Sequence, residues 1–487
     1  MICCPKRDKI STVPESEWRE NMKNKIIPVL VALLLTGCTG QIAAPPLPIS
    51  AQSLDVQTSI AETIPNEVIV KYRSGFNTQS TRTLPGAEVL DVFNTYEEST
   101  QLHRLPSNTQ MDQALKTYAS DPGVEFAIPN VRYQVQMSLT ERVKKLFKSP
   151  TPSSTPNPIS SKSPSKSQTL ARTVMPDIPG LTAPSVKDST SDASANGEQW
   201  YLSSLQMAQV WSDHGAGSSG ITVAVLDTGV DYTHPALLGR IIKGPDYIDK
   251  DYDPKDEHGH GTHVAGIITA GTPDNQGFSG LAPNVRVLAI RVLDAKGSGS
   301  LFNIAKGIAY AANNGAKVIN LSLGSPPGGG LMRSLANFLA GYAERKGALI
   351  IAAAGNAGSD IGYPAAASKF LAVGATNEQN YLASFSNRGA ELDIVAPGVN
   401  ILSTFPTYEV TANASGLPQN YASLNGTSMA TPMVSALAAM LLSQDPYLKP
   451  AALRARLEAT ATDLGPLGRD NQFGHGVINP SKALEQD

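Results

Sequence analysis

The stretch Asn425-Gly426-Thr427-Ser428-Met429-Ala430-Thr431-Pro432 determines how the rest of this chain is interpreted. Small residues lead to one serine, and an apolar run at helical spacing follows it, through Val434, Leu437, Met440 and Leu441. The pattern predicts a buried helix with Ser428 at its N-terminus. Unpaired N–H groups and the positive end of the helix dipole favour a serine oxygen that becomes negative there. A serine in this place is also an ordinary helix cap, so other motifs have to decide.

Apolar runs of strand length alternate with helical patterns beyond residue 196. The runs lie at 221–226, 285–290, 317–321 and 348–353, with helical spacing at 301–312 and 331–342. This alternation predicts an α/β domain over residues 196–487, a doubly wound and mostly parallel sheet flanked by helices. Functional groups in such sheets gather beyond the carboxyl ends of the strands, so candidate residues should lie there.

Asp227 directly follows the strand predicted at 221–226, at the expected functional edge. Taken alone, it is also a common turn or helix cap. Further along, His260 stands between glycines and enters a helix of small residues, which suits a base that approaches a substrate. His258 and His263 beside it raise the alternative of a metal site, but the His-Glu-x-x-His arrangement of a zinc helix is missing.

Together, Asp227, His260 and Ser428 carry the groups of a nucleophilic hydrolase. A hydroxyl is a poor nucleophile until a base removes its proton, imidazole suits that task near neutral pH, and a carboxylate holds its tautomer. The order Asp, His, Ser and the motifs around these residues resemble the subtilisin-like serine proteases, or subtilases, over about residues 200–480. The motifs are Asp227-Thr228-Gly229, His260-Gly261-Thr262-His263-Val264-Ala265-Gly266 and Gly426-Thr427-Ser428-Met429-Ala430-Thr431-Pro432.

This resemblance implies a serine endopeptidase that acts on proteins or peptides through an acyl-enzyme and needs no cofactor for catalysis. It makes the side chain of Asn356, after the strand at 348–353, a donor to the oxyanion, with the Ser428 N–H as the second donor. The competing class is a non-catalytic surface protein that keeps the groove as a peptide-binding module.

The same resemblance implies a substrate-binding segment at Ser322, Leu323 and Gly324, which pairs with extended peptide as an added strand. It makes Gly362 the floor of the specificity pocket. A glycine floor leaves room for a large apolar side chain, and no acidic cluster selects basic residues, so broad apolar specificity is expected.

Asp246, Asp249, Asp251 and Asp253 crowd one loop before His260. Carboxylate oxygens at this density suit Ca²⁺ and repel one another without a cation. The spacing resembles a calcium loop of some subtilases, with Asp246 and Asp251 as the best-matched ligands, so a structural calcium ion is expected. The alternative is a solvated acidic loop.

Residues 1–38 have the character of an export signal, in which a basic start at 22–25 precedes a short apolar core. The end, Leu35-Thr36-Gly37-Cys38, resembles a bacterial lipobox, which implies a lipidated Cys38 that anchors the protein to a membrane. Met22 is an alternative start of the chain. The expected location is the bacterial cell envelope or outer membrane, with release of the catalytic domain as a further expectation. The alternative is an ordinary secretory signal with an incidental cysteine.

After a tether at 39–63, residues 64–136 predict a small α+β domain, with a strand at 67–73, a helix at 111–118 and a strand ending at 130. The stretch Val124-Glu125-Phe126-Ala127-Ile128-Pro129-Asn130 resembles the end of a subtilase prodomain, which implies that the chain inhibits itself before maturation. An unrelated α+β domain is the alternative. Residues 137–195, rich in Ser and Pro, predict a flexible linker.

The overall composition excludes some classes of protein. The net charge of −3 argues against a nucleic-acid partner. The 3 cysteines are Cys3, Cys4 and Cys38, so no disulfide can form downstream of residue 38. The catalytic domain therefore depends on core packing, and on any bound metal, for its stability.

Overall fold

The computed structural model of the chain describes residues 62–76, 84–95, 98–135, 199–271, 278–326 and 330–485. They belong to one compact unit, Thr58–Asp487. The predicted signal region with Cys38, the predicted linker and all but the end of the tether lie outside the described residues. Within the described residues, no helix has the length and apolar character needed to cross a bilayer.

The C-terminal part is built on seven strands: β5 (Thr222–Asp227), β6 (Ile241–Asp246), β7 (Arg286–Arg291), β9 (Val318–Leu321), β11 (Leu349–Ala353), β12 (Leu371–Thr376) and β13 (Ile394–Pro397). They form one sheet in the order β13-β12-β11-β9-β5-β7-β6, and every pair is parallel. Most strand residues are buried, as expected for a parallel sheet that is covered on both faces.

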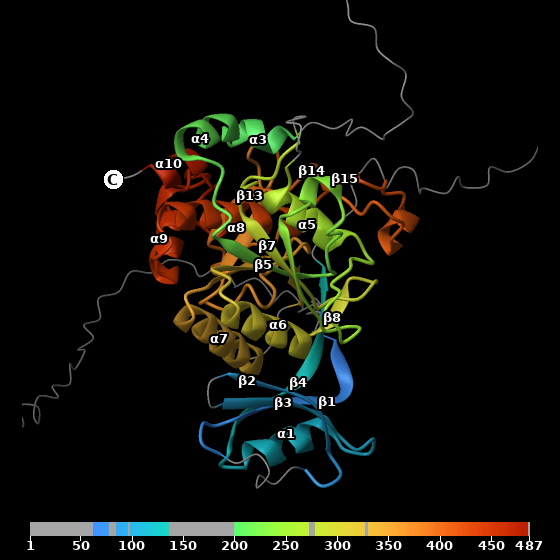
Figure 1. Cartoon of the computed structure of the whole chain (residues 1–487). Coiled ribbons are helices and arrows are strands. Elements are labelled where there is room, and N and C mark those ends of the chain that lie inside the picture. Colours follow the sequence, from blue (N-terminus) through green and yellow to red (C-terminus); the bar gives the residue numbers. More distant parts are fainter. Residues whose placement is uncertain are drawn as a thin grey trace, which may run out of the picture. The chain divides into compact units, whose positions relative to one another are not determined.

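Helices surround this sheet: α3 (Trp200–Ser204), α4 (Met207–His214), α5 (His260–Thr269), α6 (Leu301–Asn313), α7 (Gly330–Arg345), α8 (Thr427–Gln444), α9 (Pro450–Thr460) and α10 (Pro480–Leu484). Val223 and Val225 of β5 share an apolar cluster with α5 and α8, whereas Ala224 and Leu226 share another with α6 and α7. The two pairs of helices therefore cover opposite faces (Figure 1). The predicted doubly wound α/β fold is confirmed.

Short elements complete this part: 3₁₀ helices η1 (Pro235–Leu237) and η2 (Thr411–Ser415), and strands β8 (Ser298–Ser300), β10 (Leu323–Gly324), β14 (Ile401–Thr404) and β15 (Tyr421–Leu424). The last two pair with each other. The strands β8 and β10 lie apart from the main sheet and pair instead with the N-terminal part of the chain.

The N-terminal part contains β1 (Thr63–Tyr72), β2 (Glu88–Thr95), β3 (Glu98–Arg104), α1 (Met111–Ala119) and β4 (Val124–Val135). Its antiparallel strands follow the order β4-β1-β3-β2, and α1 packs on them through Ala114 and Tyr118. The predicted α+β character is confirmed. The elements β2 and β3 were not among the predicted ones. The strand β2 lies at the edge of the sheet and has only two buried side chains, so its sequence gives little apolar alternation.

Candidate active site

Asp227, His260 and Ser428 come from different elements that meet at one edge of the sheet. Asp227 ends β5, His260 begins α5, and Ser428 lies in the first turn of α8. Gly259 precedes His260 with φ of 108°, where a Cβ would collide with the ring of Phe405. Only glycine fits this left-handed and crowded position, so the chain can turn sharply into α5.

The Asp227 carboxylate holds the ring of His260. Its Oδ1 lies 2.7 Å from His260 Nδ1 and also accepts the Thr228 N–H at 2.8 Å. Because a carboxylate only accepts here, Nδ1 carries the hydrogen and Nε2 presents a lone pair. His260 Nε2 is buried and has no partner among the described residues. The His260 imidazole is therefore oriented to act as a base through Nε2.

The Ser428 hydroxyl donates to the carbonyl of Ser322 at 2.8 Å, and not to His260. In turn, the Ser322 hydroxyl donates to the Ser428 carbonyl at 2.9 Å. The structure thus brings the three predicted residues to one place, but the bond between nucleophile and base is absent from the hydrogen bonds of the described residues. Catalytic hydrogen bonds often tighten only when substrate binds. The hydroxyl has to leave the Ser322 carbonyl to reach His260.

Asn356 lies just beyond β11 with its amide held by one neighbour. Its Oδ1 accepts from both the backbone N–H and the hydroxyl of Thr427, each at 2.9 Å. This pairing leaves Nδ2 as the remaining group of the amide, and Nδ2 is buried and has no partner among the described residues. The N–H of Ser428, in the first turn of α8, also lacks an intrahelical acceptor. Two donors therefore converge beside the nucleophile, as an oxyanion site requires.

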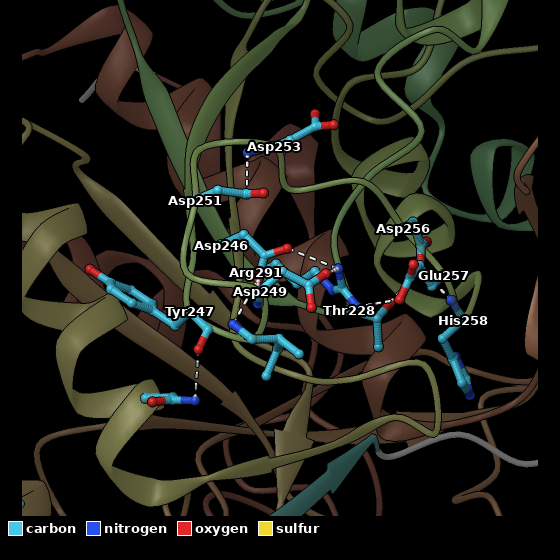
Figure 2. A network of polar contacts seen from close by, with 12 residues as sticks. Thr228, Asp246, Tyr247, Asp249, Asp251, Asp253, Asp256, Glu257, His258 and Arg291 are labelled. Carbon is cyan, nitrogen blue, oxygen red and sulfur yellow. Dashed lines mark hydrogen bonds and ion pairs between the residues drawn. The ribbon is translucent and has the colours of Figure 1, made fainter. Parts of the chain in front are cut away.

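Asp256 is a residue of the site that the sequence analysis missed. It is fully buried, and its Oδ1 accepts from Thr228 Oγ1 and from the N–H groups of His258 and Gly259 at 2.8–2.9 Å. Its Oδ2 accepts from the N–H and hydroxyl of Thr262. The carboxylate thus joins Thr228, the residue after Asp227, to the segment just before His260; Figure 2 shows its bonds to Thr228 and His258. An acidic residue four positions before a predicted helix start was the available signal.

His258 and His263 have structural surroundings. His263 Nε2 lies 3.0 Å from the carbonyls of Ile401 and Ala422, and burial lowers the pKa of His263 to about 3. Burial, followed by the charge of His260, also lowers the pKa of His258. Within the described ranges, no group of three or more His, Cys, Asp or Glu side chains is arranged to hold a metal ion.

A cleft beside the catalytic residues holds the end of β4. Val135 and Gln134 pair antiparallel with Leu323 and Gly324, and the segment 132–134 pairs with β8 on the other side. A cavity of about 380 Å³ adjoins these strands, and Gly324, Asn356 and Gly362 line it. The structure therefore places the predicted substrate segment and the predicted pocket glycine around one cleft.

The expected calcium ligands have other partners. The backbones of Asp246 and Asp251 bond each other at 2.9 and 3.1 Å. Asp246 Oδ2 accepts from Arg291 at 2.8 Å, and Asp251 Oδ1 accepts from the N–H of Asp253 at 2.8 Å. The carboxylates of Asp246 and Asp251 therefore already have hydrogen-bond or ion-pair partners. The residues present do not fit the expected Ca²⁺ ion.

A carboxylate–imidazole pair, a serine at a helix N-terminus and an amide donor on a parallel sheet define a serine hydrolase. Two family models match this chain. The model described as Subtilase family matches residues 218–476, and the model described as Fervidolysin N-terminal prodomain matches residues 51–130. The chain belongs to the subtilase family, and the predicted resemblances to a subtilase and to a subtilase prodomain are confirmed.

Individual relatives agree with this assignment. The thermophilic serine proteinase of Bacillus sp. (strain AK1) is 48% identical over 269 residues, or 55% of this chain and 62% of that protein. Thermitase of Thermoactinomyces vulgaris is 40% identical over 296 residues, or 61% of this chain and 99% of thermitase. The first match therefore spans less than two thirds of the relative. The similarity supports a serine endopeptidase, as predicted.

A solved structure is also similar. The crystal structure of a lanthipeptide protease aligns with a TM-score of 0.53 and 28% identity, over 58% of this chain and 93% of that one. This alignment agrees with the α/β fold described above.

Proposed function

We propose that this chain is the precursor of a serine endopeptidase that hydrolyses peptide bonds in proteins. Ser428 Oγ attacks the carbonyl carbon while His260 Nε2 takes the hydroxyl proton, and Asp227 steadies the imidazolium. Asn356 Nδ2 and the Ser428 N–H stabilise the oxyanion. His260 then protonates the leaving amine, and water releases the acyl-enzyme by the reverse proton transfers. The observation that carries this proposal is that two buried side-chain nitrogens have no partner among the described residues: Nε2 of His260, whose ring is held by Asp227, and Nδ2 of Asn356, whose amide is held by Thr427 next to Ser428.

The N-terminal part acts as an intramolecular inhibitor in this proposal. The end of β4 lies between β8 and β10 as an added strand, where an extended substrate would pair. Further contacts support the grip: Lys306 of α6 bonds Asp91 of β2 at 2.6 Å, and the side chain of Asn130 accepts the N–H of Phe302 at 3.2 Å. A peptide substrate cannot occupy the cleft while this strand fills it.

The register of β4 supports a particular first cut. Gln134 pairs with Gly324 and Val135 with Leu323, so the same register continued by one residue would bring position 136 opposite Ser322. The Ser322 carbonyl lies 2.8 Å from the Ser428 hydroxyl. The nucleophile would therefore meet the carbonyl of the residue that follows Val135. We infer that the chain first cuts itself between Gln136 and Met137, just beyond the described residues.

Intact mass and N-terminal sequencing of the chain from residue 39 onward test this proposal, with Ser428→Ala as the matched control. The wild type should yield a new N-terminus at Met137, and Ser428→Ala should stay whole. A fluorophosphonate probe should label Ser428 after the cut. If the wild type stays whole and unlabelled, the chain is better described as a peptide-binding module. A serine-dependent cut at another bond would keep the enzyme and overturn the proposed cut site.

The side of this cavity that the catalytic part forms supports a preference for neutral or apolar side chains before the cut bond. All its lining residues from the catalytic part are uncharged, among them Ser325, Ala354 and Gly362. A side chain beyond Cα at Gly362 would collide with the Ser325 carbonyl, so the glycine keeps the pocket open. Hydrolysis of peptide p-nitroanilides should be faster with Leu or Phe than with Lys or Asp at this position. Faster cleavage after Lys would contradict the proposal.

Export and lipid anchoring through Cys38 remain part of the proposal. The basic, apolar and small-residue order of residues 22–38 supports them. Because Cys38 precedes the proposed cut, the catalytic part would lose its covalent anchor on maturation. Cell fractionation should find the uncut Ser428→Ala chain with membranes and the cut wild-type domain in the medium. Membrane-bound catalytic domain after loss of the N-terminal fragment would count against release.

A further inference from the structure

The acidic loop between β6 and α5 converges on one arginine. Arg291 ends β7, and its backbone pairs with Asp227 of β5 on one side and with Asp246 of β6 on the other. Its side chain is only 3% exposed. A guanidinium in such a place needs compensating anions, because an unpaired buried charge is strongly destabilising.

Three carboxylates surround the Arg291 guanidinium. Its Nη1 donates to Asp246 Oδ2 and Asp249 Oδ2, both at 2.8 Å, and its Nη2 donates to Glu257 Oε2 at 2.5 Å (Figure 2). Burial acts to lower the pKa of Arg291, and the nearby charges of Asp246, Glu257 and Asp249 outweigh it and raise that pKa. The arginine thus stays charged and ties both ends of the loop to β7.

Further carboxylate oxygens of the loop also have partners. Asp246 Oδ1 accepts from the N–H groups of Ile248 and Asp249 at 2.7 and 3.1 Å. Asp253 Oδ1 forms an ion pair with Lys243 at 2.6 Å. A calcium ion requires six to eight oxygen ligands at about 2.3–2.6 Å, and here the oxygens already receive N–H groups and cations.

We propose that Arg291 is the built-in cation of this loop, which takes the place that a divalent ion would otherwise fill. Guanidinium suits the task because it is permanently charged and its fork reaches several carboxylates at once. The loop leads through Glu257 and Asp256 directly into His260, so the same arginine positions the segment that carries the base. This inference concerns the stability of the loop and does not depend on the proposed reaction.

Thermal unfolding of the full chain tests this inference, in a Ser428→Ala background that prevents self-digestion. Unfolding midpoints are compared in excess Ca²⁺ and in EGTA for the parent chain and for Arg291→Met, which removes the charge and keeps an apolar stem. We expect Arg291→Met to lower the midpoint in EGTA and Ca²⁺ to restore part of the loss. Calcium should bind this variant at least about tenfold more tightly than the parent, because three carboxylates are left without a cation.

Asp251→Asn provides the second arm, since Asp251 is exposed and its replacement should not prevent folding. Any calcium response of the parent should be unchanged in Asp251→Asn, because the proposal excludes Asp251 as a ligand. An equal calcium response in the parent and in Arg291→Met would overturn the proposal. So would a parent response that Asp251→Asn abolishes, and this arm remains decisive if Arg291→Met does not fold.

Discussion

At the scale of single residues, the site depends on which atom each side chain leaves free. Asp227 engages Nδ1 of His260 and leaves Nε2, and Thr427 engages Oδ1 of Asn356 and leaves Nδ2. A base nitrogen and an amide donor are therefore both left without a partner among the described residues. These orientations come from neighbours that never touch substrate, so replacing a neighbour should change the rate without changing the reacting groups.

Replacing the amide donor should reduce the rate of the chemical step. Asn356→Ala is expected to lower kcat by about 10²–10³-fold with little change in KM, a size that is known for this type of donor in subtilisin itself. Thr427→Val removes one of the two hydrogen bonds that orient the amide, so it should lower kcat by a smaller factor. Steady-state kinetics of the matured enzyme on a peptide p-nitroanilide measure both. A change confined to KM would show that Asn356 binds substrate and does not stabilise the oxyanion.

The sequence could predict the residues of the site better than their contacts. Asp227, Asn356 and Ser428 follow strands or begin a helix, and such positions can be read from apolar patterns. Arg291 could not be found in this way, because its carboxylate partners lie 34–45 residues away and only folding brings them together. Asp256 bonds mainly to groups within six residues, but it belongs to no apolar pattern, and its link to Thr228 forms only in the fold. The bond from Ser428 to the Ser322 carbonyl depends on a rotamer, which no sequence pattern encodes.

At the scale of elements, the start of α5 is held by a buried carboxylate. Asp256 accepts the N–H groups of Gly259 and Thr262 around the first turn, where a negative charge also meets the positive end of the helix dipole. Through Thr228 it reaches the strand that carries Asp227. The distance between acid and base is therefore set by one side chain outside the triad.

Asp256→Asn should disturb this junction. The amide places an NH₂ group against N–H donors, so we expect a loss of about 1–3 kcal/mol in the free energy of unfolding, the size found when buried donors lose their acceptor. kcat should fall while KM changes little, because His260 and Asp227 lose their common support. Denaturant unfolding and kinetics measure these effects, with exposed Asp251→Asn as the control. Lost stability with unchanged kcat would limit Asp256 to a structural role.

The strand β4 depends on one aromatic anchor. Tyr133 is 1% exposed and belongs to the apolar cluster that contains α6 and α7. Tyr133→Ala should cost about 3–5 kcal/mol of packing, the range for a buried aromatic ring. Part of this lost packing free energy should weaken the binding of β4 in the cleft. After the cut, activity on an added peptide should appear after a shorter lag than in the wild type, and the exposed Asn108→Ala, outside β4, should behave like the wild type. An unchanged lag before activity appears would contradict the role of Tyr133 as an anchor of β4.

At the scale of the whole molecule, the N-terminal part responds to pH through a buried histidine. His103 is fully buried, with Nδ1 2.7 Å from the Tyr118 hydroxyl and Nε2 2.8 Å from Gln101 Oε1. Burial lowers the pKa of His103 from 6.5 to about 4. Between these values the unfolded chain binds a proton that the folded chain does not, so stability falls as the pH falls through this window.

Acidification should therefore destabilise the N-terminal part that carries His103. The pKa difference corresponds to a loss of about 3 kcal/mol in the N-terminal part between pH 6.5 and pH 4, with no further loss from this group below pH 4. Hydrogen exchange of β1 and β3 in the Ser428→Ala chain measures the effect. In His103→Gln, which does not titrate, the pH dependence should be smaller. Equal pH dependence in both chains would exclude His103 as its source.

The strand in the cleft also changes how the protein responds to dilution. While inhibitor and enzyme are one chain, the tether keeps the inhibitor at a local concentration that does not depend on how dilute the protein is. One cut between Gln136 and Met137 would convert this arrangement into an ordinary equilibrium between two molecules. The fraction of active enzyme would then rise as the complex spreads into a larger volume. Activity would depend on distance from the producing cell, without any further signal.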